Sequence, residues 1–182
     1  MTTHAVTRLA HPVCERDHIW GAMTAPVTLL EYGDYECPRC GEAHIVMNQI
    51  VELLGDVLCY AYRHFPLTTV HPHAATAAEA AEAAGAQGKF WPMHDCLFEN
   101  QDALGDRQLI GYASMLGLNV RRFTQELTEH RHADRVRQDF LSGVRSGVNG
   151  TPTFFLNGAR HDGAWDVDSL LAAIQDVLDD DD

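Results

Sequence analysis

Two cysteines separated by two residues, Cys37 and Cys40, are the part of this sequence best suited to chemistry. A cysteine reacts as its thiolate, and two thiols at this spacing can close reversibly into a disulfide. The pair lies between a short apolar run and a segment of helical periodicity, where a strand passes into a helix. Unpaired N–H groups at a helix N-terminus favour an anion, so we expect a lowered pKa for Cys37. The pair therefore predicts thiol–disulfide exchange.

The two thiols are expected to have different roles. Cys40 lies three residues before Ala43 and seven before Met47, on the apolar stripe of the predicted helix. Cys37 lies at the tip of that helix, and Pro38 suits its first position because the missing N–H would have no partner there. We therefore expect an exposed Cys37 sulfur to attack a partner disulfide, and a shielded Cys40 thiol to resolve the mixed disulfide.

Two other interpretations of the pair stay open. A CxxC motif can supply half of a zinc site, and His71 and His73 form a compact pair of further ligands. Alternatively, two inert buried cysteines fall at this spacing by chance. The sequence context favours redox chemistry over both. Eleven histidines in 182 residues make chance proximity common, so we assign no metal to His71, His73 or His94, and no cofactor.

The elements around the pair predict a β–α–β unit, which favours parallel strands and a right-handed crossover. Residues 27–32 form a mostly apolar run, a helical pattern follows from Pro38 to Gly55, and residues 57–65 again have strand character. Later strand character at residues 153–156 is followed by Asn157 and Gly158, a turn signal for a hairpin. The expected fold is therefore α/β.

Helical periodicity dominates the sequence between these strands. Ala74 to Ala84 is rich in helix formers, Asp106 is a candidate N-cap, and a last helix is expected after Asp166 or Asp168. The apolar segment from Phe90 to Met93 is interpreted as core, with surface near the active cysteine as the alternative. We expect an N-terminal extension over residues 1–17 and one domain over 18–182, with a helical insertion at 66–149.

Composition excludes several classes of protein. Hydrophobic residues make up 46% of the chain and charged residues 21%, which is ordinary for a globular domain. A formal net charge of −13 disfavours nucleic acid and anionic membranes as partners. No apolar stretch is long enough to span a membrane, and the first residues lack the apolar segment of a signal peptide. We therefore expect a cytoplasmic protein.

The five cysteines do not form an evident disulfide framework, because their number is odd and no export signal precedes them. Cys59 and Cys96 are interpreted as small buried residues. Cys14 lies in the predicted extension, where it is either an idle thiol, a cross-link to another chain or a third redox thiol.

Three stretches resemble the DsbA-like branch of the thioredoxin superfamily, over roughly residues 18–178. They run from Ala25 to Cys40, from Tyr62 to Leu67, and from Gly147 to Phe155, the last with the sequence Gly-Thr-Pro-Thr-Phe. The resemblance implies a thioredoxin fold, with a central mixed sheet flanked by helices and a helical insertion of DsbA type. It also implies a thiol–disulfide oxidoreductase.

The resemblance further assigns roles to single residues. It implies that Pro152 follows a cis peptide bond and faces the cysteine pair, and that the Thr151 backbone pairs with an extended peptide. Glu31 matches the family's buried acidic residue behind the resolving cysteine, where a raised pKa would let it accept the proton of Cys40. The alternatives are a Pro152 that only starts a strand and a Glu31 that reaches solvent. The predicted catalytic residues are Cys37, Cys40 and Glu31, and the predicted substrate-binding residues are Pro38, Arg39, Thr151 and Pro152.

The predicted substrates are protein or peptide thiols and disulfides, or low-molecular-weight thiols, together with an unidentified redox partner. The direction of electron flow stays open. Arg39 stands where the best-known relative has histidine, and a cytosolic glutathione pool would keep a strongly oxidising pair reduced. A second hypothesis is a binding module on the same scaffold, switched by the disulfide but without turnover.

Overall fold

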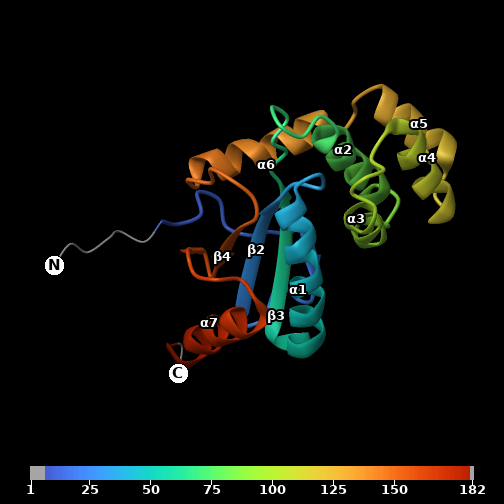
Figure 1. Cartoon of the computed structure of the whole chain (residues 1–182). Helices are drawn as coiled ribbons and strands as arrows, with labels where there is room; N and C mark the ends of the chain where they lie inside the picture. The colour runs from blue at the N-terminus through green and yellow to red at the C-terminus, as the bar shows by residue number, and fades with distance from the viewer. Residues whose placement is uncertain (1–6, 181–182) are drawn as a thin grey trace.

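The computed structural model describes residues 7–180, which form a five-stranded sheet with helices on both faces (Figure 1). No helix within this described part is long and apolar enough to cross a membrane. The elements in chain order are β1 (His18–Trp20), β2 (Val27–Gly33), α1 (Pro38–Leu54), the short 3-10 helix η1 (Gly55–Val57), β3 (Leu58–His64), α2 (Ala74–Gly85), α3 (Phe90–Glu99), α4 (Asp106–Met115), α5 (Val120–Thr128), α6 (Ala133–Arg145), β4 (Thr153–Leu156), β5 (Ala159–His161) and α7 (Val167–Asp180).

The sheet has the strand order β1-β3-β2-β4-β5 and is mixed. Strands β2 and β3 are parallel, whereas β1 is antiparallel to β3 and β4 is antiparallel to β2. Because β2 has neighbours on both sides and helices on both faces, it is almost continuously buried rather than alternating. The predicted β–α–β unit and the hairpin between β4 and β5 are confirmed. Strand β1 was not predicted, because three residues carry no periodic signal.

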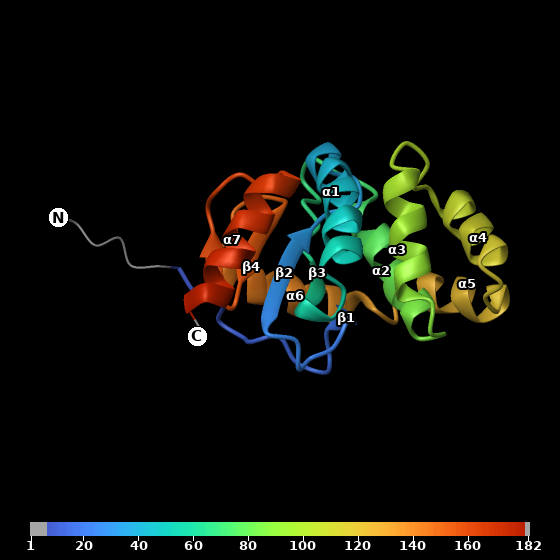
Figure 2. The ribbon, with the colours of Figure 1, turned by 90° about the horizontal axis from the view of Figure 1, so that it is seen from below.

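Different helices cover the two faces of the sheet (Figure 2), and the two faces have separate cores. Helices α1 and α7 cover one face, where Met47 and Ile50 of α1 and Leu170 of α7 pack on strand residues. The chain near Leu9 and Val13 and helix α6 cover the opposite face. This arrangement fixes α1 against the sheet along its whole length, and therefore fixes the start of α1 at the end of β2.

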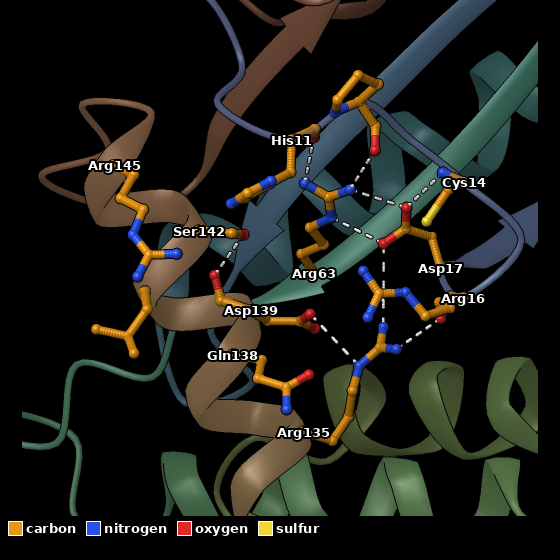
Figure 3. A pocket seen from close by; sticks show the side chains of 12 residues that line it. His11, Cys14, Arg16, Asp17, Arg63, Arg135, Gln138, Asp139, Ser142 and Arg145 are labelled. Atoms are coloured by element: carbon orange, nitrogen blue, oxygen red, sulfur yellow. Dashed lines mark hydrogen bonds and ion pairs between the residues drawn. The ribbon is translucent and has the colours of Figure 1, made fainter.

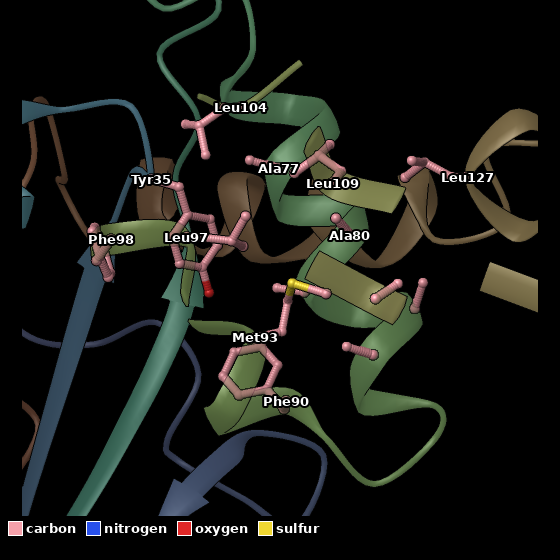
Figure 4. Packing of buried hydrophobic residues seen from close by; sticks show 14 of the residues in the cluster. Tyr35, Ala77, Ala80, Phe90, Met93, Leu97, Phe98, Leu104, Leu109 and Leu127 are labelled. Carbon is pink, nitrogen blue, oxygen red and sulfur yellow. The ribbon is translucent and has the colours of Figure 1, made fainter. Parts of the chain in front are cut away.

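The four helices α2–α5 form a lobe beside the sheet, within the predicted insertion. Alanines of α2 allow close approach of α3, and Met93, Leu97 and Leu109 fill the centre of the lobe (Figure 4). The same core continues to Tyr35 and to the cysteine pair. Phe90 and Met93 are buried here, as the core interpretation predicted.

One helix start differs from the prediction. Helix α4 begins at Asp106 itself, with Gly105 as the N-cap, so Asp106 is not the capping residue. Its carboxylate lies in the first turn, where a negative charge is favourable beside the free N–H groups. At α7 the prediction of Asp166 is confirmed, because its carboxylate accepts a hydrogen bond from the Ser169 N–H.

The described part of the predicted extension packs on the domain through a buried arginine (Figure 3). Arg63 of β3 donates to both carboxylate oxygens of Asp17, each at 2.8 Å, and to the carbonyls of His11 and Pro12. Burial alone would raise the pKa of Asp17, but the hydrogen bond and charge of Arg63 lower it overall. The segment is therefore tied to the sheet by an ion pair with few open hydrogen-bonding positions.

We predict that Arg63→Met lowers the free energy of unfolding by about 3–5 kcal/mol, because Asp17 would stay buried without its partner. Urea denaturation measures the change. The control is Arg131→Met, which removes an ion pair to Glu129 on the surface and should change stability by no more than about 0.5 kcal/mol. Equal effects of the two substitutions would contradict the prediction.

Candidate active site

The cysteine pair lies at the start of α1, with Cys37 as the N-cap residue. The Cys37 carbonyl accepts hydrogen bonds from the N–H groups of Cys40 and Gly41, at 3.1 and 3.2 Å. Cys40 is fully buried, as its position on the apolar stripe predicted, whereas Cys37 retains 7% of its surface. The expectation of an openly exposed Cys37 sulfur is therefore wrong, because Thr151 approaches it from the loop before β4. The order of exposure of the two thiols is still the predicted one.

Several donors around Cys37 stabilise its thiolate and lower its pKa to about 5. The largest contribution is a hydrogen bond with the Cys40 side chain; burial opposes it, and the Thr151 side chain and the N–H groups of Cys40 and Arg39 add to it. The Thr151 hydroxyl has no other hydrogen-bond partner among the described residues, so it is free to serve the sulfur. The lowered pKa was predicted, but its main source is the second thiol rather than the helix terminus.

Burial favours the protonated forms of Cys40 and Glu31, in contrast to Cys37. Burial, the hydrogen bond to Cys37 and the charge of Glu31 raise the pKa of Cys40 well above its usual value. Glu31 lies in the middle of β2 and is 1% exposed, so the alternative of a solvent-facing carboxylate is excluded. Burial raises the pKa of Glu31 to about 7, although Tyr60 donates a 2.7 Å hydrogen bond to its Oε2. The other oxygen, Oε1, is buried without a partner and can take a proton.

The loop before β4 brings Thr151 and Pro152 to the cysteine pair across a large sequence separation. The Thr151–Pro152 peptide bond is cis, and the Thr151 carbonyl oxygen lies 3.6 Å from the Cys37 Sγ. In the thiol form, Cys37 donates to this carbonyl. The backbone of Thr151 is therefore placed to contact whatever molecule approaches the sulfur.

Comparison with known proteins gives the family. The thioredoxin family model matches residues 14–176. This chain belongs to that family. The structure is similar to oxidised BdbD from Bacillus subtilis, with a TM-score of 0.83 and 22% identity over 96% of this chain and 100% of that one. It is also similar to α-DsbA1 from Wolbachia pipientis, with a TM-score of 0.78 and 22% identity over 93% and 94% of the two chains. The predicted thioredoxin fold with a DsbA-type arrangement is confirmed.

A curated relative carries a different name. The chain is 48% identical over 160 residues to the Na⁺/H⁺ antiporter NhaA 1 of Salinispora arenicola, which covers 88% of this chain but 24% of that protein. This thioredoxin-family chain thus spans about a quarter of the length of the curated relatives that it matches.

Pro38 and Arg39, two predicted substrate-binding residues of this thioredoxin domain, lie exposed between the cysteines. The Arg39 guanidinium lies 5.6 Å from the centre of the Trp165 ring, a cation–π contact with the loop before α7. That contact holds the arginine beside the reactive turn. Its role toward a substrate stays a prediction, as does that of Pro38.

Asp34 organises the turn before the cysteines, and sequence reasoning missed it. Its carboxylate accepts hydrogen bonds from the N–H groups of Glu36 and Leu67 and contacts His71 Nδ1, each at 2.8 Å. Burial lowers the pKa of His71, but the hydrogen bond and charge of Asp34 and the charge of Cys37 raise it overall. The run Asp-Tyr-Glu before the first cysteine was a signal for such a turn.

The two histidines of the zinc alternative contact carboxylates instead. His71 contacts Asp34, and His73 contacts Glu36 at 2.9 Å. Two clusters of metal-ligating side chains occur among the described residues, and neither contains a cysteine of the pair. The geometry therefore gives no support to a zinc site built on the CxxC motif.

Gln101, in the link from α3 to α4, clamps the reactive turn. Its amide nitrogen donates to the carbonyls of Tyr35 and Cys37, at 2.9 and 2.8 Å. A side chain at Gly41 would collide with Gln101, so glycine after the second cysteine makes room for the clamp. Nothing in the sequence pattern pointed to Gln101, because it lies 64 residues from Cys37. Next to it is a polar pocket of about 560 Å³ that Glu36 and Pro38 also line.

The other thiols lie away from the pair. Cys59 and Cys96 are buried, as predicted, and burial raises the pKa of each. Cys14 is half-buried, and its N–H donates to the Asp17 carboxylate. Its three predicted alternatives stay predictions.

We predict that the reduced chain absorbs as a thiolate from about pH 5 upward, because Cys37 ionises there. Ultraviolet absorbance against pH should show one such transition, and Cys37→Ser should remove it. Cys59→Ser is the control and should leave it in place. If the transition that Cys37→Ser removes lies near the unperturbed value, about 8.5, the lowered pKa is contradicted.

We further predict that Gln101→Ala lowers the free energy of unfolding by about 1–3 kcal/mol, since it removes two partly buried hydrogen bonds to backbone carbonyls. The variant should also change the rate of Cys37 alkylation, measured with the alkylating reagent below saturation. Gln108→Ala is the control, because Gln108 lines the same pocket without contacting the reactive turn. Indistinguishable stability and alkylation in the two variants would exclude the clamp.

Proposed function

We propose that this chain is a thiol–disulfide oxidoreductase in which Cys37 is the nucleophile and Cys40 the resolving thiol. The observation that carries the proposal is the opposite ionisation of two adjacent thiols. Cys37 has a pKa of about 5 and some exposed surface, whereas Cys40 is fully buried and its pKa is raised. A buried structural pair would have no reason to hold one sulfur as an anion.

The reaction follows from these two states. The Cys37 thiolate attacks one sulfur of a substrate disulfide, forms a mixed disulfide and releases the first substrate thiolate. Glu31 accepts the Cys40 proton, and the Cys40 thiolate then attacks the Cys37 sulfur. The second substrate thiolate leaves, so the substrate gains two electrons and the chain is left with a Cys37–Cys40 disulfide. The same steps in reverse oxidise a substrate dithiol.

The lowered pKa of Cys37 bears on the direction of electron flow between the pair and its substrate. A stabilised thiolate favours the reduced form of the pair, which makes its disulfide a better oxidant than one between unperturbed thiols. We infer that the pair passes its disulfide on more readily than a thioredoxin reductant with a potential of about −270 mV. α-DsbA2 of Wolbachia pipientis, a solved structure of similar fold, is described as a thiol-disulfide exchange protein, which supports thiol–disulfide exchange as the general kind of activity.

The substrate site is proposed at the Thr151 backbone, beside the Cys37 sulfur. An extended peptide could pair with this backbone as an added strand, which supports protein or peptide thiols over small ones. Pro38, Arg39 and Pro152 are the further substrate-binding residues that we propose. The redox partner and a cytoplasmic location stay predictions. Ion transport is not extended from the antiporter relatives, because the match covers about a quarter of their length.

We predict that Cys37→Ser abolishes turnover of a disulfide peptide and that Cys40→Ser traps the mixed disulfide. Mass spectrometry of the quenched reaction distinguishes the two. Cys59→Ser is the matched control and should retain full turnover. Retention of peptide binding with no turnover in the parent chain would favour the redox-switched binding module instead.

We also predict a pH effect from Glu31. Its carboxylate becomes an effective base as the pH rises through about 7, so the resolving step should accelerate across that range. Glu31→Gln should slow this step about 100-fold at pH 7.5 and flatten its pH profile. Rapid-quench measurement of mixed-disulfide decay tests this, and an unaltered profile would exclude Glu31 as the base.

A further inference from the structure

A second cavity lies behind the reactive helix, between α1 and α3. Its volume is about 380 Å³, and Trp20, Tyr60 and Trp91 form much of its apolar wall. Its polar lining includes His44 from α1 and the neighbours His94 and Asp95 from α3. One ligand atom from each of these three side chains lies within 4.8 Å of the other two. The cavity therefore combines access with a cluster of nitrogen and oxygen donors.

We propose that His44, His94 and Asp95 bind a divalent transition-metal ion, with Zn²⁺ the best chemical match. Imidazole nitrogen with one carboxylate oxygen is a donor set that suits zinc, cobalt and nickel. A tetrahedral zinc site, with bonds of about 2.0–2.1 Å, places its ligand atoms about 3.4 Å apart. His44 Nε2 and Asp95 Oδ1 are already 3.7 Å apart. The cavity leaves the fourth position to water.

The state of the three side chains favours a cation at this place. His44 is 6% exposed and His94 is 2% exposed, so both rings are largely shielded from bulk water. At 3.7 Å the contact of His44 with Asp95 is too long for a hydrogen bond. No other cationic group pairs with Asp95 among the described residues. The carboxylate therefore lacks the positive partner that a metal ion would supply.

The surroundings also provide outer contacts for the ligands. His94 Nδ1 lies 3.0 Å from the Tyr35 hydroxyl, which leaves Nε2 as its free donor and orients the ring. His44 Nε2 contacts the Asn48 amide at 3.2 Å, and the exposed Asn48 side chain must turn away when a metal binds. The half-exposed Asp95 supplies the remaining movement.

The second histidine cluster in the described residues has a different character. His18 Nε2 and His64 Nε2 both contact Glu82 Oε1 at 2.8 Å, so its donors are already paired with each other. The Arg135 guanidinium lies 3.8 Å from the same oxygen and supplies a positive charge. A metal there would have to displace these hydrogen bonds and approach a cation. The cluster of His44, His94 and Asp95 is therefore the better site for a metal ion.

The proposed metal would connect the two parts of the molecule. His44 lies one turn after Cys40 on α1, and α3 belongs to the helical lobe. Tyr60, which donates to Glu31, lines the same cavity. The inference is independent of the thiol chemistry, because none of the three ligands is a cysteine or one of the proposed substrate-binding residues.

The test uses Co²⁺ as a spectroscopic probe, followed by displacement with Zn²⁺, in the full chain carrying Cys37→Ser and Cys40→Ser. We expect one equivalent of Co²⁺ with visible d–d absorption and without thiolate charge transfer. Asp95→Asn and His44→Gln should each weaken binding at least 10-fold. Zn²⁺ should raise the melting temperature of this double-serine chain. It should not raise that of the same chain with Asp95→Asn. If His44→Gln fails to fold, the half-exposed Asp95 decides the outcome.

Two control variants change histidines outside the proposed metal site. His18→Gln tests the second cluster, and His130→Gln changes an exposed histidine that contacts only Glu79. Both should bind Co²⁺ as the parent does. Absence of saturable binding, a thiolate charge-transfer band, binding that Asp95→Asn leaves intact, or loss of binding in His18→Gln would each overturn the proposal. Thiol–disulfide turnover of the chain with both active cysteines is measured separately, so that failure of the metal site and failure of the enzyme are distinguishable.

Discussion

The hydrogen bond from the Cys40 thiol to the Cys37 sulfur is the interaction on which this site depends. It is the largest contribution to the lowered pKa of Cys37, and it requires that Cys40 keep its proton. Burial and the nearby charge of Glu31 ensure this, because both disfavour a second anion. The same carboxylate has a pKa of about 7 and can later remove that proton. One buried residue thus maintains the resting state and, in the proposed cycle, ends it.

The helical lobe serves the site as well as the core. Gln101 holds two carbonyls of the reactive turn, and Asp34 ties that turn to the chain leading into α2. The apolar core of the lobe continues to Tyr35 and to both cysteines. The lobe therefore limits the positions that the Cys37 sulfur can adopt. A thioredoxin sheet alone would leave that turn facing solvent on this side.

Charged side chains away from the site are arranged in two distinct ways. Arg63 forms hydrogen bonds with both Asp17 carboxylate oxygens and with the carbonyls of His11 and Pro12, and it fastens the N-terminal segment (Figure 3). His44, His94 and Asp95 leave donors unpaired around an accessible cavity. The first arrangement is what a structural ion pair needs, and the second is what a bound cation needs. The two arrangements therefore differ in how far their polar atoms are hydrogen-bonded, rather than in the types of residue.

The sequence by itself determined the β–α–β unit, the place of the cysteine pair at a helix start and the burial of Cys40, because each follows from local periodicity. Its match to a known motif also indicated Glu31 and the Thr151–Pro152 loop. Only the tertiary structure decided that Cys37 is largely covered and that Gln101 clamps its turn. It likewise decided which of eleven histidines meet. These facts depend on contacts between segments far apart in the chain, and such contacts are set by the packing of whole elements, which local spacing does not encode.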